Sequence, residues 1–309
     1  MKFFVMLAVL LLRNFYGQKL TLPLDKTFNA WQVFIAKRLQ QGLGSSVVFL
    51  LCVMPLVLLL WLLLWWLDGV YWYLPVLAIH LLTVIYALGR RCDLVWIERY
   101  IAAWRQGDEQ AASYYAAEVL GEPLHESHQK NDGKLHARVI SRLVVFAFDR
   151  LFLVLFWYLL LGPVGVLMAR LTEQAITNAR KEANQLDKEG VALTCCEEQV
   201  VRFQQVMHWP AARLMGLTLG LTGRPLLGFR QFMGDVFRWK LSTEVFLNRQ
   251  LMTGYGLLSR GEDTESAYYQ RPEMMTDAAE EELAGLRERV WRSLAVWVAV
   301  TAVGVIFWF

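Results

Sequence analysis

Residues 47–67 read VVFLLCVMPLVLLLWLLLWWL, an uncharged apolar run that contains one proline, Pro55. A second apolar run covers residues 70–89, and only Asp68 and Gly69 separate the two. At about 1.5 Å per residue, roughly 20 apolar residues in a helix cross a hydrocarbon core of about 30 Å. The two runs therefore predict a transmembrane helical hairpin with almost no loop.

The flanks of this hairpin predict its orientation. Aromatic rings, which favour the headgroup level of a bilayer, gather around the turn at Trp61, Trp65, Trp66, Tyr71, Trp72 and Tyr73. Basic pairs lie at the other end, with Lys37-Arg38 before the first run and Arg90-Arg91 after the second. Because basic residues accumulate on the cytoplasmic side, we expect both basic ends in the cytoplasm and the turn outside.

The composition agrees with a membrane protein and excludes other classes. Of the 309 residues, 56% are hydrophobic and 19% are charged, whereas soluble domains carry about 25% charged residues. A net charge of +3 without a basic face argues against a nucleic-acid partner. The cysteines, at positions 52, 92, 195 and 196, fit neither a zinc knuckle nor a disulfide scaffold, so we expect buried or reduced thiols.

The predicted fold class is all-α, a polytopic helical membrane protein with about four to six membrane-associated helices and polar helical loops. We expect a single domain over residues 1–309. Beyond the hairpin, its parts are an N-terminal apolar segment at 1–16, a polar loop at 92–141, a span at 143–169, a polar region at 170–289 with an embedded apolar piece at 206–229, and a last span at 290–309.

Gly162 and Pro163 are expected to kink the third span. The N-terminal segment lacks a cleavage site and is expected to stay, either partly embedded or as a short span. The acidic stretch 277–282 predicts a helix start before the last span.

The most distinctive stretch runs from Val206 to Leu214, reading VMHWPAARL. Trp209 and Pro210 predict the start of a helix there, and Gly216 and Gly220 allow a neighbouring helix to approach closely. Arg213 is its one cation. Two roles are open for Arg213. On packing grounds alone, the favoured role is in a packing helix, with the charge directed to the membrane interface. The alternative is that Arg213 binds an anion through two hydrogen bonds.

Ionisable residues inside apolar segments are costly, and they indicate a functional site by default. Asp149 and Arg150 are such residues, and they point about 100° apart on a helix, so they cannot neutralise each other. Pairing with other helices near the inner interface is the alternative reading, and the sequence leaves both open. His80 is expected to form an interhelical hydrogen bond rather than a proton relay.

No residue pattern predicts catalysis. His125 and His128 lie three residues apart, unlike HExxH, and a solvated loop is the preferred reading for them and for His136. Gly42 to Ser46 lacks the lysine of a phosphate loop, and no GxSxG sequence is present. We therefore predict no metal site, no cofactor and no catalytic residue.

Short motifs give the chain a family resemblance. They are Phe156-Trp157, Gly162-Pro163-Val164, Leu167-Met168 and the block from Val206 to Leu214. With these motifs, and with the order of its segments over essentially the whole length, the chain resembles the AmpE proteins of Gram-negative bacteria. That family forms a superfamily with CbiB/CobD, the membrane amide synthase of cobalamin biosynthesis.

The resemblance implies a multi-pass protein of the bacterial inner membrane that modulates β-lactamase induction and is connected to the sensing of cell-wall turnover. Its expected partners are the lipid bilayer and a cell-wall-derived or lipid ligand of unknown identity, with homo-oligomerisation left open. The candidate ligand-binding residues are Trp209, Arg213, Asp149, Arg150, Trp157 and His208. We expect the ligand pocket where Trp209 and Arg213 approach the segment that carries Asp149 and Arg150.

One departure separates the chain from the synthase branch. The synthases carry paired aspartates before the final block and an acidic run before the Phe-Trp motif, where this chain has Gln204-Gln205 and Phe148-Asp149-Arg150-Leu151. Amide ligation driven by a nucleotide needs carboxylates to hold a metal against phosphates. A non-enzymatic regulator is therefore preferred, a retained amide synthase is the alternative, and a transporter ranks last because no inverted repeat is evident. Two questions of topology stay open. They are which side of the membrane holds residues 170–205 and whether residues 206–229 cross the membrane.

Overall fold

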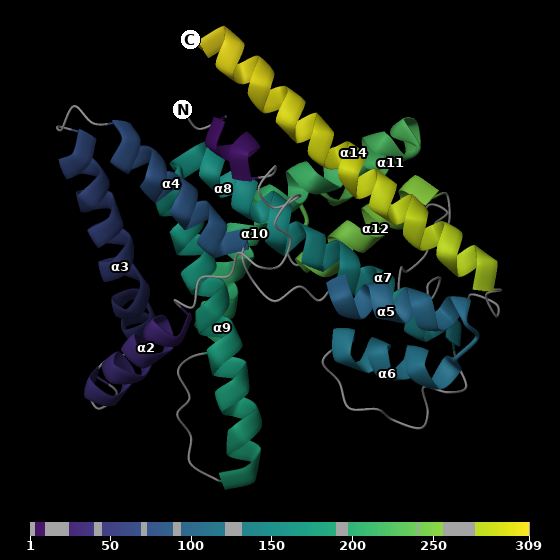
Figure 1. The fold of residues 1–309 in the computed structure, drawn as a ribbon, viewed down its shortest axis with the longest axis horizontal. Helices are drawn as coiled ribbons and strands as arrows, with labels where there is room; N and C mark the ends of the chain where they lie inside the picture. Colours follow the sequence, from purple (N-terminus) through teal and green to yellow (C-terminus); the bar gives the residue numbers. More distant parts are fainter. Residues whose placement is uncertain are drawn as a thin grey trace. The chain divides into compact units, whose positions relative to one another are not determined.

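The computed structural model describes residues 4–9, 25–39, 45–68, 73–88, 94–120, 132–189, 197–239, 241–255 and 276–308. Nearly all of these residues are helical, and no strand occurs among them (Figure 1). The all-α prediction is confirmed. The chain divides into two compact units, residues 1–91 with 153–208 and residues 92–152 with 209–309. That the whole chain acts as one domain stays a prediction.

The first unit contains the predicted hairpin. Its helices are α2 (Asp25–Leu39), α3 (Ser45–Asp68), α4 (Tyr73–Leu88), α8 (Leu153–Leu161), α9 (Pro163–Glu189) and the first part of α10 (Glu197–Thr222). Both apolar runs are helical within a few residues of their predicted limits. An apolar cluster of Phe28, Phe49, Val53, Val57, Leu171, Ala175, Ile176 and Val200 joins α2, α3, α9 and α10.

The predicted interruption at Gly162 and Pro163 is confirmed, but it separates two helices rather than kinking one span. Gly162 has a φ of 69°, which a glycine adopts without steric cost, and its N–H donates to the Tyr158 carbonyl, which ends α8. Pro163 then begins α9, a position that needs no N–H donor. At Gly165 a side chain would lie 2.8 Å from the Trp157 carbonyl oxygen, so this glycine allows α9 to pack closely against α8.

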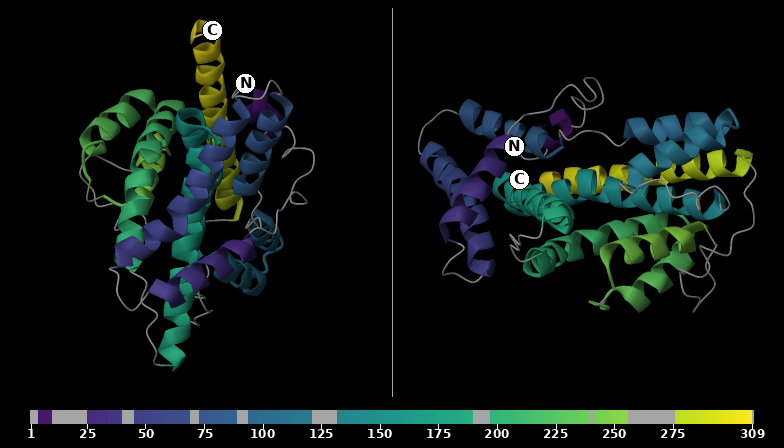
Figure 2. Two further views of the ribbon diagram at one scale, coloured as in Figure 1. Left: turned by 90° about the vertical axis from the view of Figure 1, so that its left-hand side faces the viewer. Right: turned by 90° about the horizontal axis from the view of Figure 1, so that it is seen from below.

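The second unit comprises α5 (Leu94–Arg105), α6 (Glu109–Leu120), α7 (Asp132–Ala147), the π-helix η3 (Phe148–Phe152), the rest of α10, α11 (Pro225–Asp235), α12 (Thr243–Tyr255) and α14 (Thr276–Trp308). The region predicted as the polar loop 92–141 is thus largely helical, with α5 and α6 side by side (Figure 2). The predicted helix start at 277–282 is confirmed, since α14 begins at Thr276.

The prediction of a helix start at Trp209 and Pro210 is wrong. α10 begins already at Glu197 and continues through Pro210. A proline removes one amide donor, but here it interrupts neither the 13 residues of α10 before it nor the 12 after it. The piece 206–229 is not one element either, because α10 ends at Thr222 and Pro225 begins α11.

Two helical stretches in the described residues are long and apolar enough to cross a membrane, Phe49–Leu67 and Arg138–Leu161. The helix Leu74–Leu88 is apolar but shorter. In the first stretch only 17% of the residues are buried by the protein. Leu58, Leu59, Trp65 and Trp66 are among its exposed side chains, so most of this helix presents apolar surface to its surroundings.

Candidate functional site

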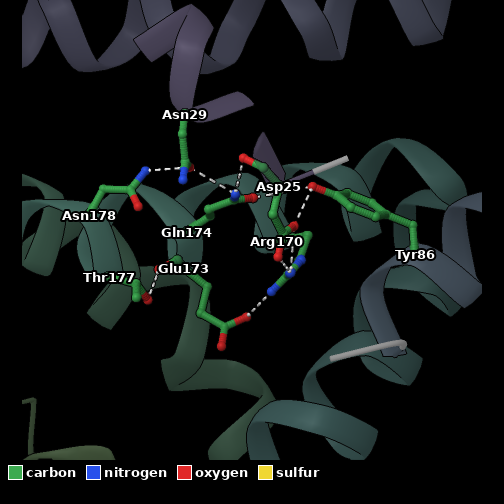
Figure 3. Close-up of polar contacts among 8 residues, drawn as sticks. All are labelled: Asp25, Asn29, Tyr86, Arg170, Glu173, Gln174, Thr177 and Asn178. Atoms are coloured by element: carbon green, nitrogen blue, oxygen red, sulfur yellow. Dashed lines mark hydrogen bonds and ion pairs between the residues drawn. The ribbon is translucent and has the colours of Figure 1, made fainter. Parts of the chain in front are cut away.

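A partly buried network of polar side chains joins three helices of the first unit. α9 contributes Arg170, Glu173, Gln174 and Asn178, α2 contributes Asp25 and Asn29, and α4 contributes Tyr86 (Figure 3). Gln32 of α2 also takes part, through Asn178. On α9 these residues recur at the three- and four-residue spacing of one helix face. The apolar cluster that includes Leu171, Ala175 and Ile176 occupies another part of the same helix.

Arg170 is the centre of this network. Its side chain is 2% exposed, and its Nη2 donates to both carboxylate oxygens of Asp25 at 2.8 Å. Its Nη1 lies 3.4 Å from Oε2 of Glu173, and its guanidinium lies over the ring of Tyr86, 5.3 Å from the centroid. Its Nε is buried and has no hydrogen-bond partner among the described residues. One cation therefore faces two carboxylates. The side chain of Asp25 is 44% exposed.

Amide side chains extend the network along α2 and α9. Nε2 of Gln174 donates to the Asp25 carbonyl at 2.9 Å and to Oδ1 of Asn29 at 3.0 Å. Nδ2 of Asn178 donates to Asn29 at 2.7 Å and to Oε1 of Gln32 at 2.8 Å. These bonds fix the register of α2 against α9, because a shift of one helix along the other would break several of them together.

Tyr86 has two acceptors within reach of its one proton. Its hydroxyl oxygen lies 3.1 Å from Oδ1 of Asp25 and 3.2 Å from Oε1 of Gln174. A hydroxyl donates one hydrogen bond at a time, so only one of these oxygens is served at any moment.

A second polar contact of the first unit confirms the prediction for His80. The hydroxyl of Tyr158, on α8, lies 3.1 Å from Nδ1 of His80, on α4, and the two rings meet edge to face. His80 thus forms the interhelical hydrogen bond that the sequence predicted. Cys52, the one cysteine among the described residues, is buried, as was also expected.

Two of the predicted site residues, Trp157 and His208, lie in the first unit. Nε1 of Trp157 donates to the Met207 carbonyl at 3.3 Å, which ties α8 to α10. Burial lowers the pKa of His208 to about 4, and the negative charge of Glu173 opposes this shift only in part. His208 is therefore neutral at physiological pH, and Glu173 connects it electrostatically to the network around Arg170.

Trp209 and Arg213 lie in the second unit, and the structure brings them together. The guanidinium of Arg213 lies 5.5 Å from the Trp209 ring centroid and 3.8 Å from that of Phe246, and Trp209 stacks on Trp239 at 4.2 Å. Arg213 is 5% exposed, and burial lowers its pKa although Asp235 partly opposes the shift.

The donors of Arg213 serve the backbone at the end of α11. Its Nε donates to the Val236 carbonyl and its Nη2 to the Arg238 carbonyl, both at 3.0 Å. Carbonyl groups at the C-terminus of a helix lack partners within the helix and attract cations. This geometry supports the packing reading of Arg213, with its charge buried in the protein rather than directed to an interface. A role in anion binding stays a prediction.

The glycines after Arg213 confirm the predicted close approach of helices. A side chain at Gly216 would lie 2.3 Å from the Phe246 ring on α12, and one at Gly228 on α11 would lie 2.4 Å from the Gly220 carbonyl oxygen. The backbones of α10 and α11 therefore touch at Gly220 and Gly228. This contact positions the end of α11 within reach of Arg213.

Asp149 and Arg150 lie in the π-helix η3, between α7 and α8. Arg150 is 8% exposed, and its guanidinium lies over the Phe146 ring at 5.1 Å. A π-helical turn inserts an extra residue into a helix and is frequent at functional sites. The approach of these two residues to Arg213 stays a prediction, as does a pocket between them. His125 and His128 lie outside the described residues, and nothing is described of the His136 side chain.

The network around Arg170 is not among the predicted sites, although the sequence contains a signal for it. Asp25, Asn29 and Gln32 recur at helical spacing, and so do Arg170, Gln174 and Asn178. Two such polar stripes, each beside apolar residues, predict helices that pair through their polar faces. Comparison with protein-family models, with curated proteins and with solved structures finds no match to this chain.

Proposed function

We propose that this chain is an integral membrane protein of the bacterial inner membrane that regulates β-lactamase induction, as AmpE proteins do, in response to a cell-wall-derived or lipid ligand. The motifs that resemble the AmpE family support the regulatory role. The exposed apolar surface of α3 supports the membrane location, because exposing so many large apolar side chains to water is unfavourable. We further propose that several more helices, α4 and the end of α14 among them, associate with the bilayer.

The observation that carries the proposal is the ion pair of Arg170 with Asp25, within the polar interface of α2, α4 and α9. α9 follows directly on the apolar stretch Arg138–Leu161. Arg170 lies about two turns after the start of α9. Ionisable groups among membrane helices are costly to keep, so their retention favours a functional role. Hydrogen bonds are directional, and an interface built from them changes between distinct arrangements rather than continuously.

The chemistry of the network suits a ligand derived from the cell wall. Such fragments carry hydroxyl, amide and carboxylate groups, and the network offers amide donors, amide acceptors and a guanidinium. The Nε of Arg170, which is buried without a partner in the described structure, is one donor that such a group would satisfy. Binding there would compete with the bonds that hold α2 against α9, and so would alter the packing of these helices.

The test is the induction curve of β-lactamase in a strain that lacks the gene for this chain. Complementation with the wild-type chain is compared with Asn178→Leu, which removes both bonds from Asn178 to α2. Thr177→Val is the matched control, because the Thr177 hydroxyl bonds only to the Glu173 carbonyl of its own helix. The proposal predicts that Asn178→Leu shifts the inducer concentration for half-maximal β-lactamase activity, whereas Thr177→Val behaves as the wild type at equal membrane abundance.

Two results would contradict the proposal. Deletion with no effect on induction would remove the regulatory role. If deletion alters induction but Asn178→Leu and Thr177→Val give indistinguishable induction curves, the polar interface is not the site of regulation.

A further inference from the structure

α11 and the four residues after it present an apolar face that the described part of the protein leaves largely exposed. The buried positions of α11 are Gly228, Phe232 and Asp235. Six apolar side chains at other positions of α11 and beyond its end are exposed: Leu226 86%, Leu227 47%, Phe229 47%, Met233 50%, Phe237 80% and Trp239 64%. Of these, Trp239 stacks on Trp209 through one side of its ring. Together, these six residues are called the α11 face below.

Basic residues border the α11 face. Arg224 and Arg230 are exposed and form no ion pair among the described residues, and the side chain of Arg238 is 61% exposed. The one carboxylate of this segment, that of Asp235, is 2% exposed. It lies 3.3 Å from Arg238 and 3.5 Å from Arg249, and accepts a hydrogen bond from Gln231. The surface that remains is therefore apolar and cationic, with its negative charge directed inward.

The length of α11 excludes a crossing of the bilayer. Its 11 residues extend about 16 Å, about half of a hydrocarbon core. A short helix with an apolar face, basic flanks and exposed aromatic rings is typical of segments that lie in the plane of the interface. Apolar side chains then enter the acyl boundary, and arginines reach the phosphates of anionic lipids.

We infer that α11 lies in the plane of the membrane, with the α11 face in the acyl boundary and Arg224, Arg230 and Arg238 on anionic lipid headgroups. The charge of the segment selects this occupant, since a neutral apolar partner would leave Arg224 and Arg230 without counter-charges. The close contact of Gly220 with Gly228 holds α11 against α10, so an interfacial α11 fixes the depth of that helix. The inference rests on the membrane location proposed above and adds to it.

The test places one nitroxide label at a time on the full chain, in lipid nanodiscs of phosphatidylcholine with or without phosphatidylglycerol. The cysteines at 52, 92, 195 and 196 are first replaced by alanine. Labels at Leu226, Phe229 and Met233 report on α11, one at Leu59 reports on α3, and one at the exposed Gln106 marks water. Relaxation by oxygen measures contact with lipid, and relaxation by a soluble nickel chelate measures contact with water.

We expect nickel accessibility at Phe229 to be several-fold lower than at Gln106, and lower still when phosphatidylglycerol is present. Labels at Leu226 and Met233 should lie at equal depth, whereas a helix along the membrane normal would separate them by about 10 Å. A label at Phe229 that contacts water while Leu59 contacts lipid would overturn this inference alone. A label at Leu59 that contacts water would overturn the membrane location as well.

Three other results would also overturn the inference. A steady depth gradient from Leu226 to Met233 would show a re-entrant helix. An immobile label at Phe229, shielded from both reagents, would show a protein partner on the α11 face. Equal accessibility in the two lipid compositions would remove the role of anionic lipid.

Discussion

Replacing Gly228 with alanine should destabilise the protein, because the new methyl group has no space. Its carbon would lie 2.4 Å from the Gly220 carbonyl oxygen and 2.6 Å from two further backbone atoms of Gly220. Contacts between heavy atoms are optimal near 3.5 Å, so α10 and α11 must separate by about 1 Å. The neighbouring atoms belong to backbone, and no side chain can rotate away to relieve the contact.

The expected size follows from two opposing effects. Overpacking of a close contact costs about 1–3 kcal/mol in the free energy of unfolding. Alanine is a better helix former than glycine by up to about 1 kcal/mol, which offsets part of this cost. The net loss of about 1–2 kcal/mol corresponds to a fall in melting temperature of about 2–8 °C for a protein of this size.

Gly234 on the same helix supplies the matched control. A side chain there meets no atom within 4 Å, so Gly234→Ala keeps the gain in helix propensity and adds no clash. The assay is thermal unfolding of the purified protein in detergent, followed by circular dichroism at 222 nm. Equal melting temperatures for Gly228→Ala and Gly234→Ala would refute the close contact of α10 with α11.

Three further predictions use the same assay. Asp25→Asn should lower the free energy of unfolding by up to about 3–5 kcal/mol, because it takes a carboxylate away from the Arg170 guanidinium, whose side chain is only 2% exposed; Arg170→Gln should cost only about 1 kcal/mol, since the Asp25 carboxylate that it leaves unpaired keeps 44% exposure. Equal losses would contradict this assignment. Arg213→Lys should cost about 1–3 kcal/mol, because an ammonium group cannot replace the planar fork that serves two carbonyl groups, and an unchanged melting temperature would argue against that role. The pKa of His208 lies at about 4, below its ordinary 6.5, so the unfolded chain binds more protons between these values and stability should fall as the pH drops from 6.5 to 4; His208→Gln should flatten this dependence, and an unaltered slope would count against a buried neutral imidazole.

Much of the fold was predictable because its signals are local. The limits of α3 and α4 follow from composition, and the break between α8 and α9 follows from Gly162 and Pro163, whose backbone preferences act within a few residues. The close approach at Gly220 was predictable for the same reason. Pro210 was misread because a proline within a long helix signals a helix start as well as a break, and its position alone does not separate the two.

The contacts that matter for function were not predictable, because they join distant parts of the chain. Asp25 and Arg170 are separated by 145 positions, and no local pattern pairs them. The partners of Arg213 are backbone carbonyl groups, which any sequence supplies, so the sequence left its role open between packing and ligand binding. Only the helical spacing of the polar residues on α2 and α9 indicated that two polar faces were available to meet.

The exposed apolar surface of α3 is the observation that supports the membrane location of the chain. The proposed role of the polar interface and the inferred position of α11 both assume that location. The measurement that tests this location most directly is extraction of cell membranes with alkaline carbonate, followed by centrifugation and detection of the chain. We predict that the chain stays in the pellet and enters solution only with detergent. A monomeric chain in the aqueous supernatant, folded without detergent, would contradict the account.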